Sequence, residues 1–411
     1  MESLFDRLKS LGVQVGAKQV PAHSPEAASR KVTIQEVVSG EDVLTPFGPV
    51  FVSRKVYGPA TLQGSVPLCE FRDVEILAEW NRTPEIAEHH PYSYLFLDAE
   101  TSGLSGGAGT FAFLVGIGFL SPQGFELHQV FLRDPGMEAA FLAYIEQLAA
   151  RFKVIVSFNG KAFDIPLLNT RFTLYGFQNV FSEHAHVDLL QLARRLWRDR
   201  LPSRRLGSLE TEILGLERTT EEVPGWMVPE LYIDYLDHQD AGPLQGVFYH
   251  NEMDIVSMAA LFHLCADILS QSNPNRSLHG LDRAALARLY EDLGRIPQAL
   301  ALYESALQQG DLPPINFAQT LHRYARIFKR RGDWQTAADL WKRAADLGDA
   351  EACIELAKYC EHQLSCPAEA FTWAQRALQA GIPPHWTPAQ CRDFDSEIHK
   401  RLSRLNRLLT P

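Results

Sequence analysis

The chain has 411 residues, of which 46% are hydrophobic and 22% charged, a composition typical of a soluble globular protein with two or three domains. Its formal net charge of -11 argues against a general binder of nucleic acid, which usually has a basic balance. Six cysteines without a C-x-x-C pair argue against a zinc knuckle and against a disulfide scaffold. We therefore expect a cytoplasmic protein with reduced thiols.

Residues 1–90 form an N-terminal region to which the sequence assigns no chemistry. A short amphipathic helix is predicted over Leu4–Leu11, and a polar loop follows it. The segments 32–38, 48–57 and 60–68 are predicted to be short strands, because glycine and proline punctuate them. These strands form either a small module that packs on the next domain or a piece that binds a partner.

Residues 91–270 have the pattern of an α/β domain. Strands are predicted over Tyr94–Glu100, Thr110–Leu120 and Phe125–Leu132, and their short connections predict an antiparallel meander. Helix, strand, helix and strand follow, and the domain ends in a long helix over Val247–Leu269. This order predicts a mixed sheet with flanking helices. The most apolar run, residues 111–120, is too short to cross a bilayer, so we expect no membrane association.

Residues 278–411 follow a polar segment at 270–277 and are predicted to be a helical repeat domain. Pairs of alanines spaced seven residues apart recur at intervals of 38 and then 33 residues, near the 34 residues of tetratricopeptide repeats. The pairs are Ala299 with Ala306, Ala337 with Ala344, and Ala370 with Ala377. The alternative is a plain helical bundle. Repeat arrays usually bind partners, so we expect a protein partner here.

Three acidic patterns carry the candidate chemistry. Asp98 and Glu100 end an apolar strand, and residues two apart on a strand face the same side, so the two carboxylates would repel unless a hard cation such as Mg²⁺ or Mn²⁺ lay between them. Asp164 ends the motif "NGKAFD", where capping the next helix is the simpler explanation. His250 and Asp254 share one helix face, where an exposed ion pair would also explain them.

In their order along the chain, the three patterns resemble the DEDD superfamily of 3′–5′ exonucleases, which have a ribonuclease-H-like fold. In detail the sequence looks like the YprB-type group, whose members join such a domain to tetratricopeptide repeats. The resemblance covers residues 91–270 and the repeats, and is weaker before residue 90. It implies an α/β ribonuclease-H-like mixed sheet followed by an all-α tetratricopeptide-like domain.

The resemblance also implies a role for each site residue. Asp98, Glu100, Asp164 and Asp254 would bind two ions, Mg²⁺ or Mn²⁺, that hold the scissile phosphate of single-stranded DNA or RNA. His250 would orient or deprotonate the attacking water. The superfamily places Tyr four residues, or His five residues, before the last Asp, whereas here His250 is at minus four and Tyr249 at minus five. Helical geometry favours His250, which shares a face with Asp254.

A substrate strand has several predicted contacts. By the resemblance, Asn159 and Phe163 would hold the terminal nucleotide, and Thr101 and Leu104 would line its pocket. The segment "RRLWRDRLPSRR", residues 194–205, holds six arginines, including Arg204, and Trp197 within it is a candidate for stacking on a base. An ordinary solvated helix face explains the segment equally well. Asp188 either supports the metal ligands or caps the helix that follows it, and we favour capping.

Two functions remain at this point. The first is a metal-dependent 3′–5′ exonuclease acting on single-stranded nucleic acid. The alternative is a non-catalytic scaffold that binds nucleic acid and a protein partner. All four carboxylate positions are filled, which favours the enzyme. The sequence leaves open DNA or RNA as substrate, and exonuclease or endonuclease action.

Overall fold

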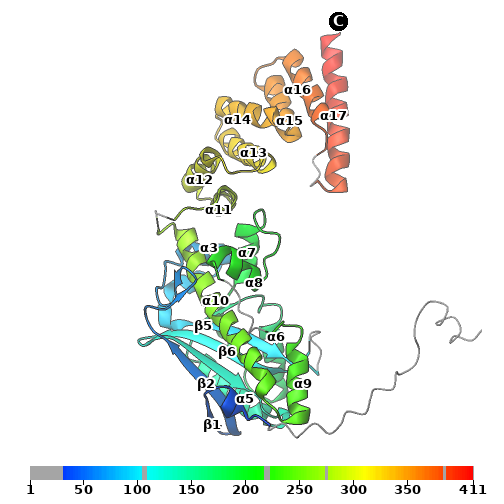
Figure 1. Cartoon of the computed structure of the whole chain (residues 1–411). Helices are drawn as coiled ribbons and strands as arrows, with labels where there is room; N and C mark the ends of the chain where they lie inside the picture. Colours follow the sequence, from blue (N-terminus) through cyan, green and yellow to red (C-terminus); the bar gives the residue numbers. More distant parts are fainter. Residues whose placement is uncertain (1–30, 104–108, 217–222, 274–275, 383–385, 411) are drawn as a thin grey trace, which may run out of the picture.

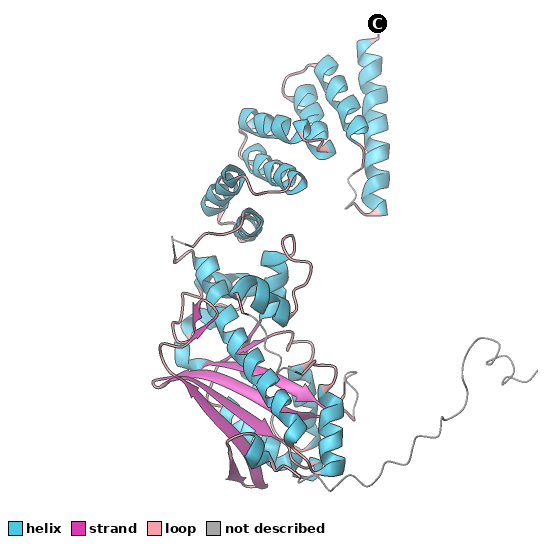
Figure 2. Cartoon of the chain, in the orientation of Figure 1, coloured by secondary structure: helices cyan, strands magenta, loops and turns pink. Residues whose placement is uncertain are grey.

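The computed structural model describes residues 31–103, 109–216, 223–273, 276–382 and 386–410. An α/β part comes first in the chain, and an array of helices rises from one end of it (Figures 1 and 2). The predicted fold class is confirmed: a mixed sheet with flanking helices is followed by an all-helical region. The predicted helix over Leu4–Leu11 lies outside the described residues.

One seven-stranded sheet organises the α/β part, in the order β1-β2-β7-β6-β5-β8-β9. The strands from β1 to β5 pair antiparallel, whereas β5, β8 and β9 pair in parallel. The strands of this sheet are β1 (Glu41–Thr45), β2 (Gly48–Tyr57), β5 (Tyr94–Thr101), β6 (Ala112–Ser121), β7 (Gly124–Phe131), β8 (Val154–Ser157) and β9 (Ala185–Asp188). A two-stranded ribbon, β3 (Leu62–Gln63) with β4 (Val66–Pro67), lies outside it.

The strands β1 and β2 extend this sheet with residues that precede the predicted domain boundary at residue 90. Register fixes their place, because Phe51 pairs with Phe131 and Tyr57 pairs with Phe125. Glu252 ties the same strand to the long helix, since it accepts a hydrogen bond from the Tyr57 hydroxyl at 2.5 Å. Part of the N-terminal region is therefore integral to the α/β sheet.

Helices cover both faces of the sheet. They are α2 (Ile34–Val37), α3 (Glu75–Asn81), α4 (Glu85–Glu88), α5 (Glu138–Ala149), α6 (Asp164–Leu174), α7 (Leu189–Trp197), α8 (Leu206–Leu209), α9 (Val228–His238) and α10 (Gln245–Ser270). Because side chains alternate along a strand, Tyr94 and Phe96 face the core shared with α3, α7 and α10. Leu95 and Leu97 face the other core, shared with α5, α6 and α9.

Helix α10 is the element that covers the middle of the sheet (Figure 1). By length and composition, the helical segment Gly242–Ser270 would suffice to cross a membrane, with a mean hydropathy of 1.5 over its most apolar window. That window is 83% buried inside the protein. Burial against β5 and β6 therefore accounts for its apolar composition.

The C-terminal part consists of helices joined by short connections: α11 (Gly280–Asp292), α12 (Ile296–Gln309), α13 (Pro314–Arg330), α14 (Trp334–Asp346), α15 (Ala350–His362), α16 (Pro367–Ala380) and α17 (Pro388–Leu409). Consecutive helices pack in pairs. The six alanines of the sequence pattern are fully buried, and Gly294 and Gly332 have φ angles of +74° and +80° just after α11 and α13. The all-helical region is thus established, and its assignment to the tetratricopeptide class stays a prediction.

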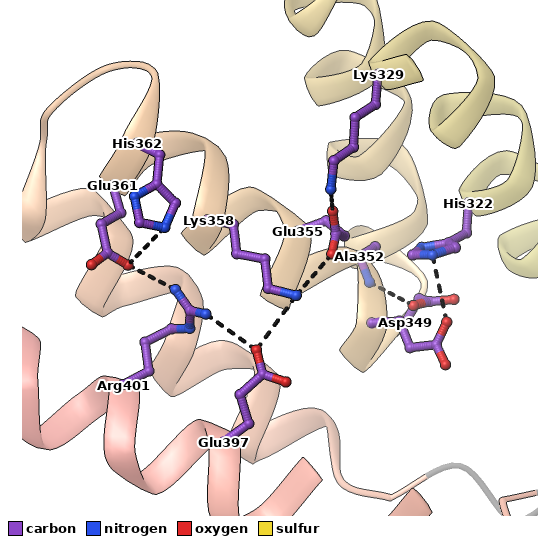
Figure 3. A network of polar contacts seen from close by, with 11 residues as sticks. His322, Lys329, Asp349, Ala352, Glu355, Lys358, Glu361, His362, Glu397 and Arg401 are labelled. Carbon is purple, nitrogen blue, oxygen red and sulfur yellow. Dashed lines mark hydrogen bonds and ion pairs between the residues drawn. The ribbon is translucent and has the colours of Figure 1, made fainter. Parts of the chain in front are cut away.

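Charged side chains link α13, α15 and α17 (Figure 3). Lys358 bridges Glu355 at 3.0 Å and Glu397 at 3.4 Å, and Arg401 bridges Glu397 at 3.1 Å and Glu361 at 2.7 Å. The alternation of sign along this chain of contacts fixes α17 against α15. It supports the ordered packing of the last helices.

The first of the C-terminal helices share a hydrophobic core with the α/β part. Leu286 and Tyr290 of α11 belong to the same cluster as Trp197 and Leu269. The Tyr290 hydroxyl donates to the backbone oxygen of Leu269 at 2.5 Å, and Arg200 pairs with Asp282 at 2.5 Å. The segment at 270–277 therefore joins two parts that are packed together.

Candidate functional site

Asp98 and Glu100 lie near the end of β5, on the sheet face that α10 covers. Side chains alternate between the two faces of a strand, so Asp98 and Glu100 face the same side of β5 as Tyr94 and Phe96, which are buried under α10. Asp98 pairs with Gly116 of β6, and a register shift follows between Glu100 and Thr101. The strand thus carries both acids under the long helix.

Two glycines of β6 allow α10 to approach the sheet closely. A Cβ atom at Gly116 would lie 2.4 Å from Oδ1 of Asn251, and a Cβ atom at Gly118 would lie 2.6 Å from a methyl carbon of Ile255. Real side chains do not tolerate such contacts, so only glycine fits these positions. The glycines within the apolar run "FAFLVGIGFL" therefore position the helix that carries His250 and Asp254.

A buried amide pair orients the Asp98 carboxylate. Asn251 is fully buried, and its amide donates to Oδ2 of Asp98 at 3.1 Å. Gln129, 3% exposed, donates to Oδ1 of Asn251 at 3.1 Å and to the backbone oxygen of Phe248 at 2.7 Å. Because Gln129 donates to its oxygen, the Asn251 amide presents its NH₂ group to Asp98. The sequence analysis did not identify either amide; the signals available were the apolar residues near Gln129 on β7 and near Asn251 on α10.

Replacing Asn251 with alanine is expected to weaken Mn²⁺ binding about 10- to 100-fold, as is usual when a group that orients a metal ligand is lost. Isothermal titration calorimetry of the purified protein measures this affinity directly. Glu252→Gln is the matched control, since Glu252 is the next residue but contacts Lys55 and Tyr57 of β2. Equal Mn²⁺ affinities for the wild type and Asn251→Ala would show that Asn251 does not orient the Asp98 carboxylate for metal binding.

The loop between β8 and α6 brings the third carboxylate to the site. Asp188, 2% exposed, accepts hydrogen bonds from the backbone nitrogens of Asn159 at 2.8 Å, Lys161 at 3.3 Å and Leu190 at 3.1 Å. The contact with Leu190 confirms that Asp188 caps α7. Asn159 has a φ of +68°, a conformation that Asn adopts more readily than most residues. Asp188 thus holds the turn that leads to Asp164.

Asp98, Glu100 and Asp164 are close enough for their charges to interact. Burial raises the pKa of Glu100 well above its usual range, and the charges of Asp98 and Asp164 raise it further. Burial also raises the Asp164 pKa, followed by the charge of Asp98. Three acids that the chain places at residues 98, 100 and 164 therefore converge in one buried, electrostatically unfavourable cluster.

His250 joins this cluster from α10. Burial raises the pKa of Asp98, whereas the charge of His250 and the hydrogen bond from Asn251 lower it. Nε2 of His250 lies 3.6 Å from Oδ2 of Asp254, one helical turn further on. The helix face that carries His250 therefore connects Asp254 to the carboxylates of β5.

Tyr249 lies on a different side of α10. Burial raises the pKa of Tyr57, and the charge of Glu252 and an interaction with Tyr249 raise it further. Tyr249 is thus near Tyr57 and Glu252, at the contact with β2, whereas His250 acts on Asp98. This placement supports the helical argument that favoured His250.

Comparison with known proteins places the chain in a family. It is 30% identical over 352 residues to "Uncharacterized protein YprB" of Bacillus subtilis (strain 168), covering 81% of this chain and 80% of that protein. The chain belongs to the YprB family. Residues 95–266 match the family model described as the RNase H superfamily. This match spans the sheet strands β5 to β9 and the site on α10, and a match to that superfamily suggests a nuclease.

A solved structure of the family B DNA polymerase from the hyperthermophilic archaeon Pyrobaculum calidifontis is also similar, with a TM-score of 0.34 and 16% sequence identity. The alignment covers 50% of this YprB-family chain and 30% of the polymerase. At that TM-score the likeness carries no functional argument.

The donor chemistry of the cluster fits a hard divalent cation. Carboxylate oxygens are the ligands that Mg²⁺ and Mn²⁺ prefer, and a cation would relieve the repulsion that raises the pKa of Glu100 and Asp164. Among the described residues, no three His, Cys, Asp or Glu side chains already form a group that could hold one metal ion.

The predicted substrate contacts have different placements. Phe163 is 61% exposed next to Asp164, and Asn159 lies in the turn held by Asp188. The Thr101 hydroxyl donates to the backbone oxygen of Gly103 at 2.9 Å, and Leu104 lies outside the described residues. Arg204 lies between α7 and α8, where it donates to the backbone oxygens of Leu201 and Pro202. Its contact with a substrate stays a prediction.

Of the two explanations left open for residues 194–205, stacking of Trp197 on a base is contradicted. Trp197 is 1% exposed in the core between α7 and α11, so its ring offers no face to a base. Arg195 and Arg200 of the same segment pair with Asp292 and Asp282 of α11. The segment 194–205 therefore supplies much of the junction between the two parts of this YprB-family chain. A run of arginines does not reveal from sequence that acids of a later helix pair with it.

Proposed function

We propose that the chain is a metal-dependent 3′–5′ exonuclease that removes mononucleotides from single-stranded DNA or RNA. The observation that carries the proposal is the convergence of Asp98, Glu100 and Asp164 under the helix that bears His250 and Asp254. Its position inside a domain of the RNase H superfamily supports a nuclease. Within this nuclease proposal, we also propose that four carboxylates bind the metal ions.

In this proposal, Asp98, Glu100, Asp164 and Asp254 hold two divalent ions, Mg²⁺ or Mn²⁺. Bound ions of this kind lower the pKa of a water and stabilise the negative charge on the leaving oxygen. Asn251 holds the Asp98 carboxylate in the orientation that its hydrogen bond at 3.1 Å defines. In this proposal, the carboxylates and Asn251 thus position the scissile phosphate before the reaction.

His250 acts on the attacking water in this proposal. Its imidazole accepts the proton or orients the water, and Asp254, 3.6 Å from its Nε2, stabilises the imidazolium that results. The water oxygen bonds to phosphorus, the bond to the 3′ oxygen of the preceding nucleotide breaks, and a 5′-mononucleotide leaves. Asn159, Phe163 and Thr101 hold the terminal nucleotide.

A single-stranded oligonucleotide labelled at its 5′ end tests the proposal. Incubation of the full chain with Mn²⁺ is expected to give products that shorten one nucleotide at a time, with no products in EDTA. A 3′-terminal phosphorothioate linkage should slow the first cleavage, because sulfur replaces an oxygen of the scissile phosphate. Cuts at internal positions would indicate an endonuclease, and an intact strand at every Mn²⁺ concentration would favour the non-catalytic scaffold.

We also propose that the repeat helices bind a protein partner in the cytoplasm. The support is a groove lined by α13, the start of α15 and the segment after α16, with Ile315 61% exposed and Arg326 exposed on its wall. Its walls combine apolar side chains with charges of both signs, since Asp199, Asp349 and Glu351 line it beside the arginines. Such walls suit a peptide with apolar side chains and charges of both signs.

A further inference from the structure

Trp226 is an exposed indole to which neither the motifs nor the fold assign a role. Its side chain is 66% exposed, although tryptophan is buried to a large extent in most proteins. It lies in the segment 223–227, which leads into α9. An exposed ring of this size on a rigid support is a candidate for binding an aromatic ligand.

The backbone holds Trp226 in a fixed turn. The backbone nitrogen of Met227 donates to the oxygen of Pro224 at 2.8 Å, and that of Val228 donates to the oxygen of Gly225 at 3.4 Å. The helix that follows is anchored, because Tyr232 stacks on Phe113 with ring centroids 4.0 Å apart. The indole is therefore presented by a supported turn.

This turn lies against the candidate site. A Cβ atom at Gly225 would be 3.8 Å from Nε2 of His250, so the residue before Trp226 contacts the space beside the proposed base. Consecutive Cα atoms are about 3.8 Å apart, and an indole extends further than that from its own Cα. Trp226 is thus within reach of a nucleotide bound next to His250.

A second exposed aromatic ring lies next to a carboxylate of the site. Phe163, 61% exposed, directly precedes Asp164, whose pKa responds to burial and to the charge of Asp98. The two rings come from different elements, the start of α6 and the turn before α9. Each is one residue away from a residue that lines the cluster.

We infer that Trp226 stacks on a nucleobase of the strand, beside His250. This inference rests on the proposed function and deepens it, because it explains a preference for single strands. Stacking needs a base whose face is free, which a duplex does not offer. Every base has such a face, so the contact tolerates any sequence.

Binding of a fluorescein-labelled single strand of 12 nucleotides tests the inference by anisotropy. The Asp164→Asn background prevents digestion in Mn²⁺, and Trp226→Ala is added to it. We expect the Kd for the single strand to rise about 5- to 100-fold, the usual effect of losing one stacked base. The Kd for a blunt duplex of the same length should not change.

Three variants make the result specific. Trp226→Phe keeps an aromatic face and should bind within about 5-fold of the parent, whereas Trp226→Leu has no such face and should bind as weakly as Trp226→Ala. Leu364→Ala, at an exposed position of the repeats, should bind as the parent does. Thermal melting confirms that each variant is folded. If Trp226→Ala loses the fold, the comparison of Phe with Leu decides.

The two proposals fail in different ways. An unchanged Kd for Trp226→Ala and Trp226→Leu, in a chain that digests single strands, overturns stacking and leaves the nuclease in place. Equal losses for single strand and duplex also overturn it. A wild type that digests nothing in Mn²⁺, but binds single strands through Trp226, supports stacking and overturns the nuclease.

Discussion

Replacing Asp164 with asparagine is expected to slow Mn²⁺-dependent digestion about 10³-fold, since loss of a metal-binding carboxylate removes several kcal/mol of transition-state stabilisation. Single-turnover digestion of a labelled strand measures the rate. Asp237→Asn is the matched control, because Asp237 is an exposed acid on α9 of the same part of the molecule. Digestion by Asp164→Asn at the wild-type rate would exclude Asp164 from the metal site.

The same substitution should make the metal-free protein more stable at neutral pH. Burial and the charge of Asp98 raise the Asp164 pKa in the folded state, so the folded chain binds a proton more tightly than the unfolded chain does. Stability therefore falls as the pH rises from the unfolded pKa, about 4, through the raised folded pKa. Asparagine carries no charge and avoids this loss.

The expected rise in the melting temperature of the metal-free α/β part is about 2–4 °C at pH 7.5, the change that accompanies 1 kcal/mol in a domain of this size. Below pH 4 the carboxyl is protonated in both states, so the difference from wild type should disappear. Added Mn²⁺ should stabilise the wild type more than the variant, because only the complete site binds it tightly. A lower melting temperature for Asp164→Asn at pH 7.5 would contradict the repulsion.

Opposite effects on activity and stability, once measured, would mark a functional cluster. Natural proteins accept unfavourable electrostatics where a ligand or a reaction needs them. A purely structural set of acids would instead be paired, as Glu138 is with Arg171 on the other side of the sheet. The contrast separates residues 98, 100 and 164 from the ordinary ion pairs of this acidic chain.

Much of the fold follows from local patterns in the sequence. The strands β5, β6 and β7 and the helix α10 lie within a few residues of their predicted bounds, because apolar runs and glycine turns mark them directly. The place of β2 did not follow, since Phe51 pairs with Phe131 at a separation that no local pattern encodes. Such pairing depends on the tertiary core.

Some residues of the candidate site likewise followed from local spacing, whereas others depended on tertiary contacts. Asp98 and Glu100 share a face because of strand periodicity, and His250 and Asp254 share one because of helix periodicity, so their sequence spacing was informative. Asn251 and Gln129 were missed because their contact joins residues far apart in the chain. Gly116, which lets α10 approach, looked like one of several glycines in an apolar strand. Packing, which spacing does not describe, gives these residues their roles.

Replacing Trp197 with alanine is expected to cost about 3–5 kcal/mol of stability, the usual cost of removing a fully buried aromatic ring. The ring is 1% exposed and lies in a core that includes Leu286 and Tyr290 of α11. A hydrogen bond from Trp197 also reaches Asp282, whose pKa is raised by burial and lowered by Arg200 and by this bond. The loss should therefore weaken the α/β part and the first repeat helices together.

Urea unfolding followed by circular dichroism and by limited proteolysis near residues 270–277 measures this loss. Arg198→Ala is the matched control, because Arg198 is the next residue and its side chain is 73% exposed, so its removal should change stability by at most about 0.5 kcal/mol. Earlier cleavage at the junction in Trp197→Ala, with the control unchanged, would support one continuous core. A Trp197→Ala variant with wild-type stability but weakened single-strand binding would contradict the continuous core. It would support contact of the Trp197 ring with the substrate. Because the arginines around Trp197 pair with α11, we expect the first outcome, in which this segment holds the C-terminal helices against the α/β part.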